Sequence, residues 1–537
     1  MHKMNVADVI AAACAAHGVQ RAFGVPGGGS SLDLIAALAR VGIAFVLCRT
    51  ETGAVLAAAA DAEIRNSFGV AITTQGPGAA SGMNGLAHAS LDRAPVLFIS
   101  DGWTRAQAAF DTHQVFDQRA MSSAVVKTST RLESADAGAE LDAAIAQMLA
   151  APWGPAHVEL TGENARRVID GPHTATRTEA CLATPEREGD ATGLLRAARK
   201  PVLLVGLEAR DADAPQAVRA LAQRLQCPVL TTYKGKGIVD DAAPCVVGHF
   251  TGGAAEKECI NAADLIVLCG MDPVELIGRP WAYSAPVLEV ALHRHPVHYV
   301  KPAAGLYGSL ASSVHALLDA AAPSDWDGND IAALRTAMTQ RLHNKVASDG
   351  RLSPQDVVER AMAVAAPLRP HVTVDAGAHM FPSMAFWQAH GAGTALISNG
   401  LATMGFALPA AIARALHADG APTIAFIGDG GLMMCAGELA TAAQERAKLC
   451  VVVFNDEALS LIELKQRSRG MARSGVALNA VDFASVARGF GMQAFTATTL
   501  AEYDAALRQA FTWQEPCLID VHVDPGGYAA QAKALRG

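Results

Sequence analysis

The residue types best suited to chemistry lie at the two ends of one short stretch, residues 428–455. Asp429 stands between Gly428 and Gly430 directly after the apolar run "TIAFI", and Asn455 follows the apolar run "CVVVF". Short apolar runs rich in β-branched residues are typical of buried parallel strands, and such strands end at one edge of a sheet. We therefore expect the Asp429 carboxylate and the Asn455 amide oxygen to lie side by side.

The 24 residues between Gly430 and Asn455 contain "LMMCAGELATAAQERAK", which predicts one helix and one right-handed β–α–β crossover. A carboxylate, an amide oxygen and a backbone carbonyl form the hard-oxygen set that Mg²⁺ prefers, with phosphate oxygens completing its octahedron. Gly428, Gly430 and Gly431 let a ligand approach the backbone N–H groups at the start of the helix, which suits phosphate. The plainer interpretation is a solvent-facing turn, and the second half of the pattern, Asn455-Asp456, disfavours it.

This pattern resembles the cofactor-binding motif of the thiamine diphosphate-dependent enzymes. The resemblance runs over nearly the whole chain and favours the acetolactate synthase-like branch. It implies that Mg²⁺ joins the cofactor's diphosphate to Asp429, Asn455 and the backbone oxygen of Glu457. It also implies an enzyme that forms or cleaves a C–C bond of a 2-oxo acid.

Glu51 is the strongest catalytic candidate of the first third of the chain. It follows the apolar run "GIAFVLC" and precedes an Ala-rich helix, so burial is expected to raise the pKa of its carboxyl group. Taken alone, it also fits a first-turn glutamate stabilised by the helix dipole. The segment "RTETGA" resembles the "RHE-x-GA" segment of acetolactate synthases, which implies that Glu51 bonds the cofactor's aminopyrimidine ring and favours its imino tautomer. Thr50 departs from the family's frequent His.

Further segments resemble the same family and extend the expected site. "FGVPGG", "TTQGPGAASG", "HQVFDQ", "DAGAHM" and "GLATMGFALPAA" each match a family segment at or near the cofactor, although Ser81 replaces a family Asn. The catalytic residues implied with Glu51 are Gln114 and His113, the latter as a proton shuttle or as a structural histidine. The further cofactor contacts implied are Pro26, Gly27, Pro77, Gly377, Ala378, His379, Ala402, Met404, Leu459, Ser460 and Leu461.

The acceptor side of the site departs from the synthase pattern. "LIELKQ" stands where the family has "MVTQWQ", which puts Lys465 at a Trp position. Lys465 either binds an anionic group of the substrate or is an ordinary surface lysine, and Lys127 matches a second family lysine as a substrate contact. A non-ligating 2-oxo acid decarboxylase, similar to benzoylformate or phosphonopyruvate decarboxylases, is therefore the alternative to a carboligase.

Two other classes are disfavoured by particular residues. A NAD-binding oxidoreductase does not fit, because "GVPGGGSS" lacks the GxGxxG spacing and no ribose-binding acid follows at the right distance. A non-catalytic relic of the family does not fit either, because Glu51 and the three metal positions are all present.

The strands and helices that must position these residues follow one alternating pattern along the chain. Apolar runs alternate with Ala-rich helical segments, which predicts an α/β protein with three doubly wound parallel-sheet domains. We expect a pyrimidine-binding domain at 1–168, a central domain at 190–330 and a diphosphate-binding domain at 353–528. The polar passage "GPHTATRTEACLATPEREGDATG" is read as a linker. The resemblance leaves FAD binding by the central domain open, and its "GKG" is not a phosphate loop.

The composition limits the kinds of partner that this protein can bind. With 537 residues, 51% hydrophobic and 18% charged, the chain is typical of a multi-domain globular protein. A net charge of −9 without a basic block disfavours nucleic acid and anionic membranes. Ten cysteines without a CxxC pair predict buried free thiols, and with no long apolar run we expect a cytoplasmic protein. The family resemblance implies a homodimer or homotetramer, with the cofactor between two subunits.

Overall fold

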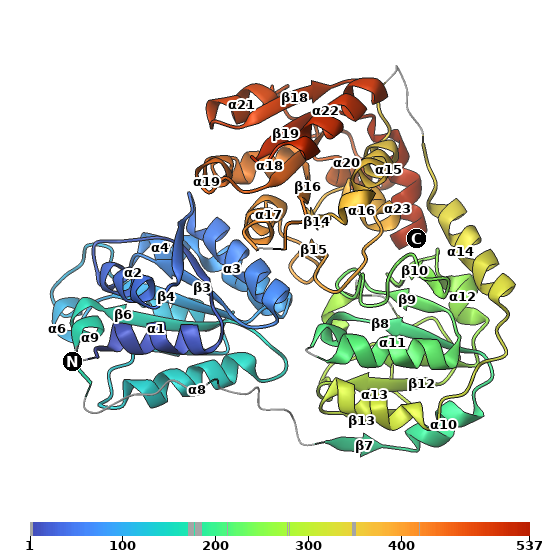
Figure 1. Ribbon diagram of the computed structural model, residues 1–537, viewed down its shortest axis with the longest axis horizontal. Helices are drawn as coiled ribbons and strands as arrows, with labels where there is room; N and C mark the ends of the chain where they lie inside the picture. The colour runs from blue at the N-terminus through green and yellow to red at the C-terminus, as the bar shows by residue number, and fades with distance from the viewer. Residues whose placement is uncertain are drawn as a thin grey trace. The chain divides into compact units, whose positions relative to one another are not determined.

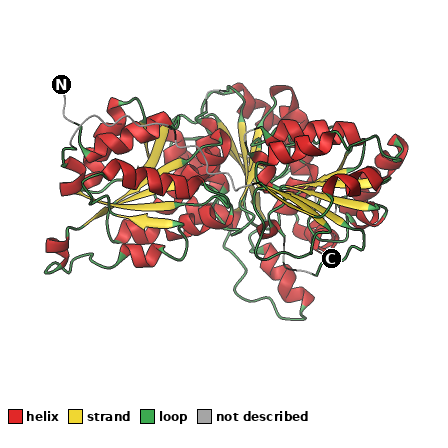
Figure 2. Cartoon of the chain, turned by 90° about the horizontal axis from the view of Figure 1, so that it is seen from below, coloured by secondary structure: helices red, strands yellow, loops and turns green. Residues whose placement is uncertain are grey.

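Three sheets organise the chain, and helices lie on both faces of each one (Figures 1 and 2). The structure is a computed structural model that describes residues 4–169, 177, 185–211, 213–276, 278, 280–345, 351–417 and 419–536. Neighbouring strands run parallel in every sheet, with one exception at the edge of the second. The predicted α/β class with three doubly wound sheets is therefore confirmed.

The first sheet has six strands in the order β2-β1-β3-β4-β6-β5. Its strands are β1 (Arg21–Val25), β2 (Ala44–Leu47), β3 (Gly69–Thr73), β4 (Val96–Gly102), β5 (Thr128–Thr130) and β6 (Ala156–Thr161). The helices of this part are α1 (Val6–Ala16), α2 (Ser30–Arg40), α3 (Glu51–Arg65), α4 (Pro77–Ser81), α5 (Met83–Leu91), α6 (Arg105–Ala108), α7 (Gln118–Ser122), α8 (Ala137–Leu149) and α9 (Gly162–Arg166).

The third sheet repeats that topology, with the order β15-β14-β16-β17-β19-β18. Its strands are β14 (His371–Val374), β15 (Ala395–Ile397), β16 (Thr423–Gly428), β17 (Leu449–Asn455), β18 (Gln493–Ala497) and β19 (Cys517–His522). The helices of this stretch are α15 (Pro354–Ala365), η3 (Ala366–Leu368), α16 (Met380–Phe386), α17 (Ala407–Ala415), α18 (Asp429–Cys435), α19 (Glu438–Gln444), α20 (Ser460–Ser468), α21 (Phe483–Gly489), α22 (Leu500–Thr512), η4 (Pro525–Gly527) and α23 (Tyr528–Arg536).

The second sheet has seven strands in the order β10-β9-β8-β11-β12-β13-β7. Its strands are β7 (Glu186–Glu188), β8 (Pro201–Val205), β9 (Val229–Thr231), β10 (Val246–His249), β11 (Leu265–Cys269), β12 (Val287–Ala291) and β13 (Ala304–Tyr307). The helices are α10 (Ala191–Ala197), η1 (Leu207–Arg210), α11 (Ala214–Leu225), α12 (Lys257–Asn261), η2 (Pro273–Glu275), α13 (Leu310–Leu318) and α14 (Gly328–Leu342).

Strand β7 corrects the linker prediction. Part of the passage read as a linker, "ERE", pairs antiparallel with β13 at the edge of the second sheet. Its three polar residues are mostly exposed and have a strand neighbour on one side only. Such a strand carries no apolar signal, because its stability comes from backbone hydrogen bonds and from pairs such as Arg294 with Glu186 and Glu188. The remainder of the passage lies mostly outside the described residues.

The segment predicted as one helix before Asn455 is two. Helix α18 ends at Cys435 and α19 begins at Glu438, with Gly437 as the residue before it. The predicted crossover itself is confirmed, because β16 and β17 are adjacent and parallel, with Gly428 opposite Phe454. The break between the two helices places Glu438 at the start of α19.

Contact analysis divides the chain into two compact units. The first comprises Met1–Cys181 with Gly400–Ala418 and Cys435–Ala447, so that α17 and α19 belong to it. The second comprises Leu182–Asn399, Asp419–Met434 and Lys448–Gly537. The predicted site residues fall in both units.

Helix α3 is buried along most of its length. Residues 53–62 are all buried, and a Cβ at Gly69 of β3 would collide with the carbonyl oxygen of Ala58. Helix α17 contacts the same helix from another side. Small residues therefore let α3 pack closely against its neighbours, and this close packing fixes the position of its first residue, Glu51.

In the described part of the chain, no helix is long and apolar enough to cross a bilayer. The nine cysteines described there are free, and eight of them are buried. The prediction of buried free thiols is confirmed for eight of these nine, Cys245 is half-buried, and Cys181 lies outside the described residues.

Candidate active site

Asp429 occupies a buried position at the carboxyl end of β16, 4% exposed. Its Oδ1 accepts a hydrogen bond from the Gly430 N–H at 2.6 Å, while its Oδ2 is buried and makes no hydrogen bond of good geometry with any described residue. Burial raises the pKa of this carboxyl group, and backbone N–H groups of Gly430 and of residues 456–458 partly offset that rise. A buried carboxylate oxygen with an open lone pair is the donor that a hard cation needs.

Asn455 ends the adjacent strand β17 and is 2% exposed. Its amide nitrogen donates to Asp520 Oδ1 at 2.9 Å, which leaves the amide oxygen as the acceptor on the other side. The Asp520 side chain also accepts the Phe483 N–H at 3.1 Å, so its orientation is fixed. Asp520 was not predicted, although it stands in the apolar run "CLIDVHVD", where a lone carboxylate is unusual.

Glu457 has a left-handed backbone, with φ 58°. Its carbonyl oxygen accepts the Leu478 N–H at 2.9 Å, and a carbonyl has a second lone pair that can face a cation. A non-glycine residue in this region stores backbone strain, which is typical of ligand-binding loops.

A second carboxyl group, Asp456, lies beside these donors. Burial, and then the nearby Asp429, raise the pKa of Asp456 to about 7, and Ser460 Oγ donates to its Oδ2 at 2.7 Å. Leu459, the residue before helix α20, donates its N–H to the Val476 carbonyl at 2.8 Å. Repulsion between a buried and a half-buried carboxyl group favours the arrival of a cation.

His379 provides a buried donor near the same strand ends. Its ring is 4% exposed, it stacks on Phe454, and its Nε2 has no hydrogen bond among the described residues. Burial lowers its pKa to about 3, so the ring is neutral at pH 7. Gly377 and Ala378 precede it after β14, and a Cβ at Gly428 would lie 3.1 Å from its Nδ1. A neutral imidazole N–H in this position suits a phosphate oxygen.

A glycine is required at 431 as well. A Cβ there would collide with Asp375 Oδ2, so the absence of a side chain lets Asp375 and α18 approach each other. Four features fit a diphosphate with a divalent cation. They are the open Asp429 oxygen, the oriented Asn455 amide, the neutral His379 ring and the close approach of the α18 backbone at Gly431.

The first unit holds the second group of site residues. Glu51 is the first residue of α3 and is half-buried, and Thr50 caps the helix through its side chain, which accepts the Gly53 N–H. A Cβ at Gly78 would lie 3.2 Å from Glu51 Oε1. The glycine therefore leaves room beside the carboxyl group, which is only partly desolvated in the chain by itself.

Pro26 and Gly27 form the turn after β1, and a buried carboxylate that was not predicted, Asp101, holds the start of the following helix α2. Asp101 Oδ1 accepts the Ser31 N–H and the Ser30 hydroxyl, each at 2.6 Å. Burial raises the pKa of Asp101. A signal was present, since Asp101 lies within the otherwise apolar strand "VLFISDG".

Gln114 and His113 are both exposed in a loop, and Gln114 has a left-handed backbone, with φ 63°. A Cβ at Gly76 would lie 2.7 Å from the Gln114 carbonyl oxygen, so this loop lies against the turn before Pro77. Gln118, which was not predicted, is fully buried and accepts the Gly76 N–H at 2.8 Å. Gln118 is thus the residue that fixes the turn.

The loop of Met404 is held within the same unit. Asp92 accepts the N–H groups of Gly400 and Leu401, each at 3.2 Å, and Asn84 donates to Thr403 Oγ1 at 2.9 Å. Met404 is half-buried, and the exposed Ala402 has φ 54°. The backbone here is therefore strained and well anchored.

The two predicted substrate lysines differ in placement. Lys127 precedes β5, at the amino edge of the first sheet, whereas Pro26, Glu51 and Pro77 follow strands at the carboxyl edge. Its Nζ donates to two backbone carbonyls, of Ala150 at 2.5 Å and of Pro152 at 2.8 Å, and this arrangement is structural. Lys465 is exposed on α20, the helix that follows the Glu457 loop. Leu461, one turn earlier, is half-buried.

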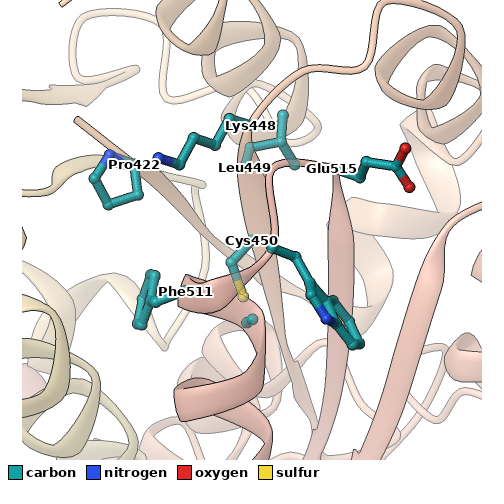
Figure 3. Close-up of a pocket in the computed structure, with 8 residues that line it drawn as sticks. Pro422, Lys448, Leu449, Cys450, Phe511 and Glu515 are labelled. Atoms are coloured by element: carbon teal, nitrogen blue, oxygen red, sulfur yellow. The ribbon is translucent and has the colours of Figure 1, made fainter. Parts of the chain in front are cut away.

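A small pocket of the second unit lies away from these residues. It is lined by residues that include Pro422 and Lys448, which precede β16 and β17, together with Phe511 and Glu515 (Figure 3). Asp429 and Asn455 follow the same two strands. The pocket is therefore at the amino edge of the third sheet and contains none of the predicted site residues.

Known protein families match the segments of this chain that contain the candidate site residues. Three family models match: the N-terminal TPP binding domain of thiamine pyrophosphate enzymes at residues 4–121, the central domain at 189–317 and the C-terminal TPP binding domain at 375–521. The chain therefore belongs to the thiamine pyrophosphate enzymes.

Within that family its relatives include acetolactate synthases. The catabolic acetolactate synthase of Raoultella terrigena is 29% identical, over 96% of this chain and 95% of its own length. The acetolactate synthase of Bacillus subtilis (strain 168) is 25% identical, over 97% and 94%. A probable 2-ketoarginine decarboxylase of Pseudomonas aeruginosa is 28% identical, over 94% and 91%. The chain is thus a thiamine pyrophosphate-dependent enzyme similar to acetolactate synthases along nearly its whole length.

Glu438 controls the start of α3 and gives a prediction. This buried carboxylate accepts the N–H groups of Arg49 at 3.1 Å and Thr50 at 3.0 Å, and the Thr441 hydroxyl at 2.7 Å. Glu438→Ala should lower the free energy of unfolding of the first unit by about 1–3 kcal/mol, because these donors lose their acceptor. Urea unfolding measures the change.

The matched control is Glu445→Ala, at the other end of the same helix and half-buried, which should change stability by less than about 0.5 kcal/mol. Equal losses in the two variants would show that Glu438 does not hold this turn.

Proposed function

We propose that this protein is a thiamine diphosphate- and Mg²⁺-dependent carboligase of the acetolactate synthase-like type, which takes a 2-oxo acid as donor. The observation that carries the proposal is the buried Asp429 Oδ2, without a hydrogen bond, at the end of the strand next to Asn455. The relatives named as acetolactate synthases support the reaction type.

Asp429, Asn455 and the Glu457 carbonyl would hold Mg²⁺, and His379 with the backbone at Gly377 and Gly430 would hold the diphosphate. All are oxygen or neutral nitrogen groups, which suits a hard cation with an anionic ligand. When bound, thiamine diphosphate supplies a carbon nucleophile that adds to a carbonyl and accepts the electrons released by decarboxylation.

Glu51 would hold and transfer the proton that activates the cofactor. Its carboxyl group is half-buried at the start of a closely packed helix, next to Gly78, where a Cβ would lie 3.2 Å from Glu51 Oε1. Met404, with Pro26 and Pro77, would orient the ring system from turns whose backbones are held by Asp92, Asp101 and Gln118.

A non-ligating 2-oxo acid decarboxylase is the second candidate. It is favoured by the relative named as a probable 2-ketoarginine decarboxylase and by the exposed Lys465 near the metal loop, where the synthase pattern has Trp. A cation there would pair with a carboxylate of the substrate. His113 and Gln114, both exposed in their loop, would then deliver the proton that releases an aldehyde.

The product distribution separates the two candidates. The protein with Mg²⁺ and thiamine diphosphate is incubated with a panel of 2-oxo acids, with and without aldehydes, and products are identified by mass spectrometry. We expect acetolactate or another 2-hydroxyketone as the main product. Aldehyde as the sole product across the panel would favour the decarboxylase and refute the carboligase.

Two variants test the separate roles of the two residue groups. Glu51→Gln should lower kcat by at least about 100-fold, since general acid–base groups contribute about 10²–10⁴, while cofactor affinity stays within a few-fold. Asp429→Ala, the comparison variant, should lose cofactor binding, read by calorimetry with Mg²⁺ present. Full turnover in Glu51→Gln would rule out its role in proton transfer.

We also propose a homodimer or homotetramer. Met433, Met434 and Ile462, on the helices that follow the metal ligands, are 42%, 61% and 44% exposed, and apolar side chains grouped in this way favour a covering subunit. Light scattering coupled to gel filtration should find activity in dimer or larger fractions only, and Met434→Asp should lower both the mass and the activity. An active monomer would contradict the proposal.

A further inference from the structure

Three side chains of the second sheet's carboxyl edge form a cluster that the proposed reaction does not use. Glu208 lies in η1 directly after β8, and His293 and His295 follow β12. One potential ligand atom from each lies within 4.8 Å of the other two. We infer that Glu208, His293 and His295 form a binding site for Zn²⁺, separate from the oxygen ligands of the third domain.

The spacing fits a metal better than a hydrogen-bonded network. Glu208 Oε1 lies 3.5 Å from His293 Nδ1 and 3.4 Å from His295 Nε2. These separations exceed the usual hydrogen-bond range of about 2.7–3.2 Å. Two ligands of a tetrahedral zinc ion, with bonds of about 2.0–2.2 Å, stand about 3.3–3.6 Å apart.

A neighbouring group shows the contrast. His298 Nε2 lies 2.9 Å from Glu289 Oε1, and the Tyr307 hydroxyl donates to Glu289 Oε2 at 2.8 Å. Both separations are shorter than those between Glu208 and the two imidazoles, and each Glu289 oxygen has a close polar neighbour. The Glu208 carboxylate accepts a hydrogen bond from the Leu292 N–H at 2.8 Å through Oε2, and its other oxygen faces the two imidazoles.

The charge around the cluster also favours a cation. The Glu208 side chain is 3% exposed and lies near the side chains of Asp272, Glu275 and Glu289. Arg294, between the two histidines in sequence, pairs instead with Glu186 at 2.5 Å and Glu188 at 2.6 Å. A divalent ion bound at Glu208 would therefore lie among carboxyl groups, with Arg294 paired elsewhere.

The imidazoles of His293 and His295 are suited to bind a divalent ion. His295 Nε2 is buried, with no hydrogen bond among the described residues. A neutral imidazole in this position has a lone pair for a metal. The His293 side chain is 16% exposed, so an ion can enter from solvent.

The ligand set selects the metal. Two imidazole nitrogens and one carboxylate suit Zn²⁺, whereas Mg²⁺ prefers oxygen ligands alone. Three protein ligands leave a fourth position for water. Because Glu208 N–H also donates to the Gly270 carbonyl after β11 at 2.8 Å, the ion would join the ends of three strands of the central domain.

The experiment uses the full-length protein, stripped with a chelator and kept in excess Mg²⁺ so that oxygen sites are filled. Zn²⁺ is titrated in competition with a chromophoric zinc indicator. We expect one zinc per chain, and His295→Ala and Glu208→Gln should weaken binding by more than about 100-fold, since even groups next to a ligand contribute about 10–100-fold. His315→Ala, an exposed histidine of α13 in the same domain, should bind as the parent does.

A second readout keeps the test independent of folding defects. Co²⁺ in place of Zn²⁺ should give the visible absorption of a four-coordinate site, and His293→Ala, the most exposed of the three, should lose it while keeping its circular dichroism spectrum. Zn²⁺ should raise the thermal-unfolding midpoint of the parent and not of His293→Ala. Absence of stoichiometric zinc, or unchanged affinity in His295→Ala, would overturn the inference. Neither result depends on thiamine diphosphate.

Discussion

A buried carboxylate with an open oxygen, Asp429, is the constraint on which the rest of the candidate site depends. Burying a charge in a protein is costly unless hydrogen bonds or a counter-ion compensate it. Here backbone N–H groups compensate in part, since Asp429 Oδ1 accepts from Gly430 and the loop at 456–458 lowers the carboxyl pKa from the other side. The parallel register of β16 and β17 puts this charge beside Asn455, whose orientation Asp520 fixes. The remaining compensation is the role of a cation and its anionic ligand.

The first and third sheets have the same strand order, and each carries a different set of candidate site residues. In both, these candidate residues follow strands at the carboxyl edge, where a parallel sheet leaves a crevice for ligands. The first sheet presents a carboxyl group at the start of a helix made of small, buried residues. The third presents hard oxygen donors and a neutral histidine. The central sheet has similar edge geometry, and its Glu208, His293 and His295 are donors of another kind, suited to a borderline metal rather than to Mg²⁺.

Three loops of the candidate site each contain a strained backbone position. Gln114, Ala402 and Glu457 are among the nine described non-glycine residues with a left-handed backbone, with φ of 63°, 54° and 58°. Such conformations cost on the order of 1–3 kcal/mol each and persist only where the surroundings enforce them. Specific hydrogen bonds hold these conformations. Gln118 fixes the Gly76 turn near Gln114, Asp92 holds the residues before Ala402, and Leu478 donates its N–H to the Glu457 carbonyl. Rigid loops of this kind keep binding groups oriented before the ligand arrives.

The sequence by itself determined the fold class, the strands that end in Asp429 and Asn455, and the place of Glu51 before a helix, because apolar periodicity and strand-end chemistry are local signals. It missed β7, a short polar edge strand inside the passage read as a linker, and it merged α18 with α19. Only the tertiary structure decided which supporting residues matter. Asp101, Gln118, Asp520 and Glu438 act on partners far away in the chain, and Lys127 lies at the amino edge of the first sheet, where it bonds two backbone carbonyls. Such relations follow from which segments pack together, and no window of the sequence contains that information.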